Sequence, residues 1–187
     1  MAIIEADISM SMDGFITGPD LEDFPGYGRG GERVHAWLHH DEGRRLSAAT
    51  LAQSGAVITG RQVYDDTDGW ESQDGFYAMP VFVVTHRPHE PVRKGDTTFE
   101  FVTGGVAAAI AAAAAAAGDR RVHIMGGAST IQQALRTGLV DRLRLHIAPL
   151  LLGSGTALFD GRHGPPVDLL ETVATPEASH LTYQVRR

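Results

Sequence analysis

A strand-like run that ends in two glycines carries the clearest chemical pattern in the chain. Gly126 and Gly127 close this run, and Ala128, Ser129 and Thr130 then open a predicted helix. Glycine lets a backbone come close to a ligand, and the free N–H groups at a helix start favour an anion such as a phosphate. The same pattern also occurs in ordinary tight connections, so its meaning depends on the residues expected nearby.

Two further strand-like runs end in basic side chains. One ends at Gly60 and Arg61, and the other ends at Thr85, His86 and Arg87. Ligands of open α/β sheets lie at the carboxyl ends of strands, so we expect these two ends and the glycine pair to meet at one site. The arginines supply permanent cations with bidentate reach. A dinucleotide with a pyrophosphate and an additional phosphate would use all three ends, which favours NADPH over NADH as the cofactor.

Three other patterns lack the surroundings that the corresponding sites need. The stretch 26–31 fits G-x-G-x-x-G, but the residues before it cannot form the strand that the dinucleotide fingerprint requires. His35 and His39 have the spacing of a helical metal pair, yet no third ligand is indicated, and a polar helix face is the alternative. Ser154 lacks the spacing of a nucleophile elbow. We therefore expect neither a Rossmann site, nor a metal site, nor a hydrolase site.

The composition indicates one globular domain over residues 1–187. Hydrophobic residues make up 43% of the chain, which is enough for a substantial core, and the net charge of −7 disfavours nucleic acid or an anionic membrane as a partner. The chain contains no cysteine, which fits a reducing cytosol, and its N-terminus lacks the features of a signal peptide. We therefore expect a cytoplasmic protein with a small-molecule partner.

Strands and helices alternate along most of the chain, and the C-terminal part is strand-like. The alanine tract 107–117 predicts a helix that Gly118 stops and that is too short to span a membrane. A long helix is expected from about Glu32 to Gln53, and the Gly-rich segment 18–31 is expected to be a loop that covers a site. The pattern predicts a three-layer α/β fold whose mixed sheet ends in an antiparallel C-terminal hairpin. The expected strands are 3–10, 56–59, 80–85, 98–102, 122–125, 142–149, 157–159, 168–174 and 180–186, with a further helix from Ser129.

Five segments, in this order, resemble those of the dihydrofolate reductase-fold family. The resemblance is closest to stand-alone bacterial members, which are similar to the reductase domain of the bifunctional deaminase-reductase of riboflavin biosynthesis. It covers nearly the whole chain and implies a three-layer αβα dihydrofolate reductase-like fold with NADPH as the cofactor. The segments are 8–16 (ISMSMDGFI), 58–64 (ITGRQVY), 81–85 (VFVVT), 124–127 (IMGG) and 148–155 (APLLLGSG).

The resemblance also implies roles for individual residues. Arg61 and the turn 85–87 would hold the adenosine 2′-phosphate, and the segment 126–130 would hold the pyrophosphate. The loop 13–18 would close over the nicotinamide, with the backbone of Ile16 facing its carboxamide. The implied activity is hydride transfer from NADPH to a small heterocyclic substrate of the pterin or aminopyrimidine kind.

Three positions depart from the family pattern. Val63 replaces a threonine that in many members donates to the pyrophosphate. Arg44 lies where dihydrofolate reductases carry a helix carboxylate, and Met125 lies where the riboflavin reductases carry an acid that grips the aminopyrimidine. The alternative function is therefore an NADP(H)-binding protein of the same fold that has lost turnover.

Asp7 is the candidate for the missing acid. Along the first strand it lies on the face opposite Ile4, Ala6 and Ile8, toward the expected substrate pocket. A carboxylate on a central strand is costly to bury unless it is hydrogen-bonded or functional. Asp7 either orients or protonates the substrate, or it is a strand acid that a neighbouring arginine neutralises. Asp13 is interpreted as the first residue of an Asp-Gly turn.

The C-terminal strands have consequences for assembly. Apolar and polar residues alternate along the stretch 168–186, and such strands leave sheet edges that need cover. The family resemblance points in the same direction. We therefore expect a homodimer that forms through the C-terminal β-rich part.

Overall fold

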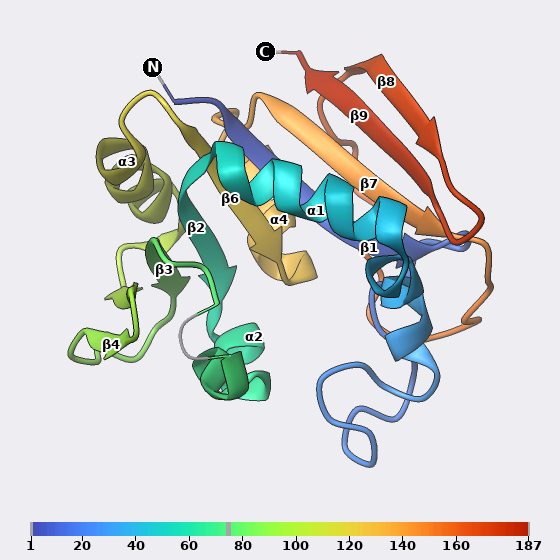
Figure 1. Ribbon diagram of the computed structural model, residues 1–187, viewed down its shortest axis with the longest axis horizontal. Helices are drawn as coiled ribbons and strands as arrows, with labels where there is room; N and C mark the ends of the chain where they lie inside the picture. The colour runs from blue at the N-terminus through green and yellow to red at the C-terminus, as the bar shows by residue number, and fades with distance from the viewer. Residues whose placement is uncertain (1, 74–75, 187) are drawn as a thin grey trace.

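In residues 2–73 and 76–186, which the computed structural model describes, nine strands form one mixed sheet at the centre of the molecule (Figure 1). The strand order is β4-β5-β3-β2-β6-β1-β7-β9-β8. Neighbours from β5 to β7 run parallel, whereas β4 at one edge and the β9–β8 hairpin at the other are antiparallel additions. The elements are β1 (Ile4–Ser11), η1 (Gly31–His39), α1 (Asp41–Gln53), β2 (Ser54–Gly60), α2 (Arg61–Asp66), η2 (Asp68–Gln73), β3 (Pro80–Val84), β4 (Val92–Lys94), β5 (Thr97–Val102), α3 (Gly105–Ala117), β6 (Arg121–Gly126), α4 (Ala128–Arg136), β7 (Arg142–Ala148), β8 (Val167–Ala174) and β9 (Ser179–Val185).

Helices cover both faces of this sheet and give the three layers that the sequence predicts. α3 and α4 pack on one face, and η1 and α1 lie over the other (Figure 1). Ile4, Ala6 and Ile8 of β1 are buried in the core that includes residues of α3 and α4. The alternate residues of β1 point to the other face, where Ser9 Oγ accepts a hydrogen bond from Trp37 Nε1 of η1 at 2.9 Å. The period of two along β1 therefore separates an apolar layer from a polar one.

The alanine-rich helix α3 is a packing element, as the sequence predicts. Val106, Ile110, Ala113 and Ala117 are buried where α3 packs on β2 and β3. Gly118 ends the helix with a positive φ of 63°. Within the described part of the chain, no helix has the length and apolar character that a membrane span requires.

The expectation of one long helix over 32–53 is wrong, because the chain breaks it at His40. His40 has an extended backbone (φ −103°, ψ 152°), so η1 ends at the preceding residue and α1 starts after it. The two segments pack closely at this break. A Cβ on Gly43 would lie 1.8 Å from the carbonyl oxygen of Trp37, so a side chain there would collide with η1. Helix-compatible residues continue across the break, which explains why the sequence does not reveal it.

The expected strand at 157–159 is also wrong. Ala157 forms an isolated bridge with Phe15, and Leu158 N donates to the carbonyl oxygen of Gly14 at 2.9 Å. The segment therefore fastens the loop after β1 instead of joining the sheet. In the opposite sense, the sequence analysis missed β4 and α2, which are too short to show a clear period.

The glycine-rich loop 18–31 closes on itself. Gly18 N donates to the carbonyl oxygen of Tyr27 at 2.7 Å. Gly28 has a φ of 69° and comes so close to Gly18 that a Cβ would lie 2.1 Å from its carbonyl oxygen. The G-x-G-x-x-G stretch therefore belongs to a loop between β1 and η1 and lacks the preceding strand that the dinucleotide fingerprint requires.

Candidate functional site

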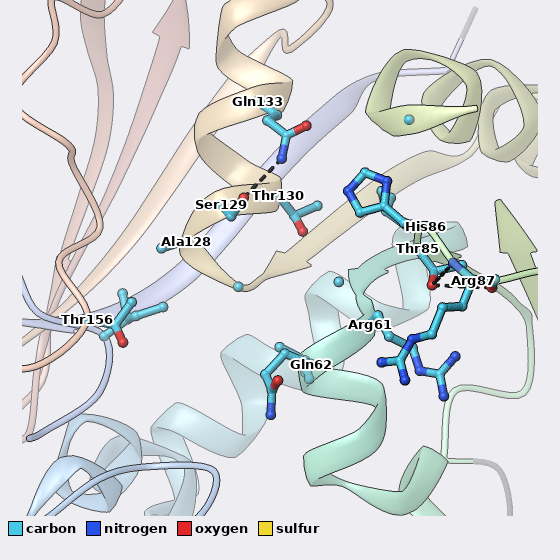
Figure 2. Close-up of a pocket in the computed structure, with 16 residues that line it drawn as sticks. Arg61, Gln62, Thr85, His86, Arg87, Ala128, Ser129, Thr130, Gln133 and Thr156 are labelled. Atoms are coloured by element: carbon cyan, nitrogen blue, oxygen red, sulfur yellow. Dashed lines mark hydrogen bonds between the residues drawn. The ribbon is translucent and has the colours of Figure 1, made fainter. Parts of the chain in front are cut away.

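A cavity of about 420 Å³ opens at the carboxyl ends of β2, β3 and β6 (Figure 2). Ligands of open α/β sheets bind at this end of the strands, and the volume is typical of small-molecule sites. Of the residues that the sequence predicts to bind the cofactor, Gly126 does not line the cavity and the others do. The lining members are Ile16, Gly60–Arg61, Thr85–Arg87 and Gly127–Thr130.

One wall of the cavity is the start of α4. Gly127 precedes this helix, and its carbonyl oxygen accepts from Ile131 N at 3.1 Å, so the N–H groups of the first turn have no acceptor within the helix. Ser129 is exposed toward the cavity, whereas Thr130 is buried. A Cβ on Gly60 would lie 2.7 Å from Thr130 Oγ1, which shows how closely β2 approaches this helix. The wall therefore provides backbone N–H donors and a hydroxyl group that can bind an anion.

Two arginines form another wall (Figure 2). Arg61 begins α2, and Arg87 lies in the turn after β3, where its N–H donates to Thr85 Oγ1 at 3.1 Å. Asp65 contacts both: its Oδ1 accepts from Arg61 Nε at 2.7 Å, and its Oδ2 lies 3.8 Å from Arg87 Nη2. His86 is exposed in the same turn. This wall is cationic, with one carboxylate as a partial counter-ion.

Sequence reasoning missed several lining residues, among them Gln62, Gln133 and Thr156. Gln133 lies one helical turn after Ser129 and donates from Nε2 to its Oγ at 2.9 Å (Figure 2). The i, i+4 spacing from the predicted anion site is the signal that could have identified it. Val63, at the position where the resemblance implies a threonine, also lines the cavity and presents an apolar side chain.

The loop after β1 is fastened against the segment 150–156. Ile16 N donates to the carbonyl oxygen of Thr156 at 2.9 Å. The carboxylate of Asp13 accepts from Gly153 N at 2.7 Å, so this residue does more than start a turn. Hydrogen bonds from the Ser11 hydroxyl and from backbone N–H groups lower the pKa of Asp13. The ionised carboxylate therefore fixes the loop that carries Ile16.

Asp7 lies outside this cavity, on the polar face of β1. Its Oδ1 is hydrogen-bonded to His146 Nε2 at 2.8 Å, and its Oδ2 lies 4.0 Å from Arg144 Nη1. Burial acts to raise the pKa of Asp7, but the charge and hydrogen bond of His146 outweigh it and hold the pKa well below its usual range. The carboxylate is therefore ionised, which favours a role in accepting hydrogen bonds over a role in donating a proton. Its side chain remains 11% exposed.

A second histidine supports the partner of Asp7. The Nδ1 atoms of His146 and His180 lie 2.6 Å apart, and the indole of Trp37 stacks on His146 with ring centroids 4.2 Å apart. Burial, with the charge of His146, lowers the pKa of His180 to about 4, so it is neutral near pH 7. His146 can donate from Nε2 to the carboxylate of Asp7, while its Nδ1 is hydrogen-bonded to Nδ1 of His180.

Met125 and Tyr77 extend this polar face. Tyr77 OH donates to Met125 Sδ at 2.8 Å, and burial, together with the nearby charge of Asp7, raises the pKa of Tyr77. Tyr77 was missed by the sequence analysis because it lies in a segment without a clear pattern. Arg44 is exposed on α1, where its guanidinium binds the carboxylate of Asp41. Neither Arg44 nor its partner therefore supplies an acid to this face.

The histidines with metal-pair spacing lie on η1. His35 packs against the ring of Tyr27, with centroids 5.3 Å apart, while His39 is exposed. Burial, with the charges of His146 and His39, lowers the pKa of His35 to about 4. Among the residues that the structure describes, no group of three or more His, Asp or Glu side chains is arranged to hold a metal ion.

Several solved structures share this architecture. A protein of Shewanella sp. PV-4 described as a riboflavin biosynthesis protein is 26% identical, with a TM-score of 0.75 and 100% of both chains covered. A pyrimidine reductase-like protein of Corynebacterium diphtheriae is 16% identical, with a TM-score of 0.65 over 100% of this chain and 92% of that one. RibD of Acinetobacter baumannii is also 16% identical, with a TM-score of 0.67; this chain is fully covered and spans 59% of that one.

The last two similarities show the fold alone, because their sequence identities are low. No curated protein matches the chain. A family model described as the RibD C-terminal domain, however, matches residues 2–180, which is nearly the whole chain. This match and the shared dihydrofolate reductase-like fold agree with the five segments that the sequence shares with that fold family. The chain therefore belongs to the family of RibD C-terminal domains.

Proposed function

We propose that the protein is an NADPH-dependent reductase that transfers hydride to a small, pyrimidine-like heterocycle. The observation that carries this proposal is the cavity at the strand ends, in which the start of α4 faces two arginines. NADPH has two separate anionic groups, a pyrophosphate and a 2′-phosphate. The helix start suits the first group, and the guanidinium groups suit the second.

Each lining element has a role in this proposal. Gly127 and the first turn of α4 would hold the pyrophosphate, while Arg61 and Arg87 would hold the 2′-phosphate. The backbone of Ile16, fixed by its bond to Thr156, would face the nicotinamide carboxamide. When bound, NADPH supplies the hydride from C4 of the nicotinamide. The protein's contribution is to bind, orient and shield the reacting groups.

The proposed substrate class follows from the polar face of the sheet and from the family. Asp7 offers an ionised acceptor, and Tyr77 offers a buried hydroxyl, near Met125. An aminopyrimidine presents N–H donors that an ionised carboxylate accepts. The Corynebacterium diphtheriae protein is described as pyrimidine reductase-like, and a Thermotoga maritima protein of this fold is described as including a 5-amino-6-(5-phosphoribosylamino)uracil reductase. Both descriptions support a substrate with a pyrimidine ring.

The first test measures cofactor choice by fluorescence titration. We expect the protein to bind NADPH about tenfold more tightly than NADH, because charge-assisted contacts to the 2′-phosphate contribute about 1.5–3 kcal/mol each. Arg61→Ala should remove most of that preference. Equal dissociation constants for the two nucleotides, unchanged in Arg61→Ala, would contradict the cofactor assignment.

The second test measures NADPH oxidation against aminouracils, pterins and quinones. We expect turnover with an aminouracil or a pterin, because these rings present N–H groups to Asp7. One observation favours a second candidate function: Met125 and the exposed Arg44 occupy the two positions where relatives carry a substrate-binding acid. Tight NADPH binding with no oxidation of any compound would favour an NADP(H)-binding protein without turnover.

A further inference from the structure

Asp65 lies between the two arginines that line the cavity. Its Oδ1 is 2.7 Å from Nε of Arg61, one helical turn earlier on α2, and its Oδ2 is 3.8 Å from Nη2 of Arg87. The side chain of Arg61 is 24% exposed and that of Asp65 is 38% exposed, whereas Arg87 is 73% exposed. The contact with Arg61 is therefore shorter and better shielded from solvent than the contact with Arg87.

The guanidinium of Arg61 is also held from other directions. The rings of Tyr64 and Phe101 lie 5.9 Å and 5.7 Å from its central carbon, within the range of cation–π contacts. Its backbone directly follows Gly60 at the end of β2. Arg61 is thus fixed at the cavity wall, and Asp65 occupies one of its N–H donors.

We propose that Asp65 is a specificity-determining residue that limits the preference of this site for NADPH over NADH. The inference rests on the proposed function, because it assigns Arg61 to the 2′-phosphate. A 2′-phosphate and the carboxylate of Asp65 compete for the same guanidinium. A bound phosphate either displaces the carboxylate from Arg61 or lies beside it, and like charges at that distance repel each other.

NADH would bring no additional charge to the same wall. It carries an uncharged 2′-hydroxyl in place of the phosphate, so the pair of Arg61 and Asp65 stays intact while the nucleotide binds. A carboxylate can also accept a hydrogen bond from a ribose hydroxyl. Asp65 therefore opposes NADPH and leaves NADH unaffected or slightly favoured, and its removal should increase the selectivity for the phosphorylated cofactor.

The experiment compares Asp65→Asn with Asp66→Asn. Asp66 is the next residue on α2, and its carboxylate accepts from Gln62 Nε2 at 2.7 Å, so the control removes the same charge without touching Arg61. Calorimetric titrations would use 2′,5′-ADP and 5′-AMP as probes of the adenosine half, and NADPH and NADH as complete cofactors. Thermal unfolding of each variant would show that it is folded.

We expect Asp65→Asn to bind 2′,5′-ADP and NADPH about tenfold more tightly, with 5′-AMP and NADH changed less than about twofold. Asp66→Asn should change none of the four by more than about twofold. Equal tightening in both variants, unchanged binding in Asp65→Asn, or weaker binding there would overturn the role of Asp65. Binding of 2′,5′-ADP gained only in Asp65→Asn would support it. Absence of 2′,5′-ADP and NADPH binding in every folded form would instead overturn the proposed function, and with it this inference.

Discussion

The neighbouring side chains determine the role of a carboxylate, as Asp7 and Asp65 illustrate. Asp7 is largely buried, and His146 keeps it ionised despite that burial. Asp65 is partly exposed and bound to a permanent cation, Arg61. We therefore propose that Asp7 accepts N–H groups of a substrate and that Asp65 competes with an anionic ligand. The difference lies in the partner and not in the residue type.

Asp7→Asn tests the first of these roles. The amide oxygen of asparagine can still accept from His146, so the local packing is kept while the charge is removed. We expect turnover on the true substrate to fall at least about tenfold, with the dissociation constant for NADPH unchanged. Steady-state kinetics with the active aminouracil or pterin, together with NADPH titration, would measure both quantities.

Two carboxylates on α1 serve as controls for Asp7. Asp41 and Glu42 are exposed at the start of that helix, and Asp41 is already bound to Arg44. Asp41→Asn and Glu42→Gln should therefore be near neutral for turnover. Wild-type turnover in Asp7→Asn would exclude Asp7 as the substrate-binding acid. A large loss in either control would place that acid on the helix and not on the strand.

Single residues were predictable where the sequence context was strong. Arg61 and Gly127 each lie at the end of a strand-like run, where ligands of α/β sheets bind, so both were predicted to belong to one site. Both line the cavity. Asp65 meets Arg61 within one helical turn of α2, whereas Tyr77 and His146 reach the polar contacts described above through tertiary packing. No local spacing reports such contacts, and the sequence could show only that Asp7 needed a partner. A neighbouring arginine is one partner that the sequence suggests for Asp7; Arg144 lies 4.0 Å from it, and His146 is closer at 2.8 Å.

At the scale of elements, the cavity depends on how α4 meets the strand ends. A Cβ on Gly60 would lie 2.7 Å from Thr130 Oγ1, so a side chain there would push β2 and α4 apart. A Cβ on Gly127 would meet Val63 Cγ2 at 3.6 Å, which is an ordinary contact. The first glycine is therefore required for packing, while the second leaves open space where a ligand would lie.

Gly127→Val should block NADPH while the protein still folds. The Cβ fits, but the two methyl groups of valine would occupy the space between the helix start and a bound pyrophosphate. We expect NADPH affinity to fall more than about tenfold, with the unfolding temperature lowered by only a few degrees. Gly60→Ala is the contrasting variant and should lose mainly stability. Normal NADPH binding by a folded Gly127→Val protein would show that the glycine pair is only a turn.

The order of the longer strands and helices was predictable, and their limits were not. A period of two in β1 and an alanine run in α3 are strong local signals, and both elements form as expected. The break at His40 and the loop at 157–159 are decided by contacts with Trp37, Phe15 and Gly14. Contacts between distant segments leave no period in the sequence, so these boundaries could not be read from it.

At the scale of the whole molecule, three histidines among the described residues are buried on the polar side of the sheet, His123, His146 and His180. Burial lowers the pKa of His180 and of His35 to about 4, from an ordinary value of 6.5, with the charge of His146 acting in the same direction. Burial also lowers the pKa of His123. The folded protein therefore keeps these side chains neutral at a pH where the unfolded chain protonates them.

This difference predicts a loss of stability in mild acid. Below pH 6.5 the unfolded state binds protons that the folded state does not take up until about pH 4. The free energy of unfolding should therefore fall steadily as the pH is lowered across that window. Denaturant midpoints measured from about pH 7 to about pH 4 would test it. His180→Asn should reduce the dependence, and exposed His163→Asn should leave it unchanged. Constant midpoints across the window would contradict the assignment of neutral buried histidines.

The far edge of the sheet bears on assembly. β8 is the last strand in the sheet order, beyond β9 (Figure 1). It carries three large exposed apolar side chains. Val167, Leu169 and Leu170 are 42%, 58% and 52% exposed. An edge strand with exposed apolar side chains favours association with another protein surface. We propose that these exposed side chains of β8 pack against a second copy of the chain in a homodimer.

The dimer can be tested by light scattering at micromolar concentration. We expect a mass of about twice the 20.0 kDa of one chain, because burial of these side chains stabilises the pair by roughly 25 cal/mol per Å² of apolar surface. Leu169→Asp would place a charge in that interface, so it should shift the protein to the monomer. Leu139→Asp, which changes an exposed leucine after α4, should leave the dimer intact. A single 20.0 kDa species in the unmodified protein would overturn the proposal, and equal dissociation in both variants would remove β8 as the interface.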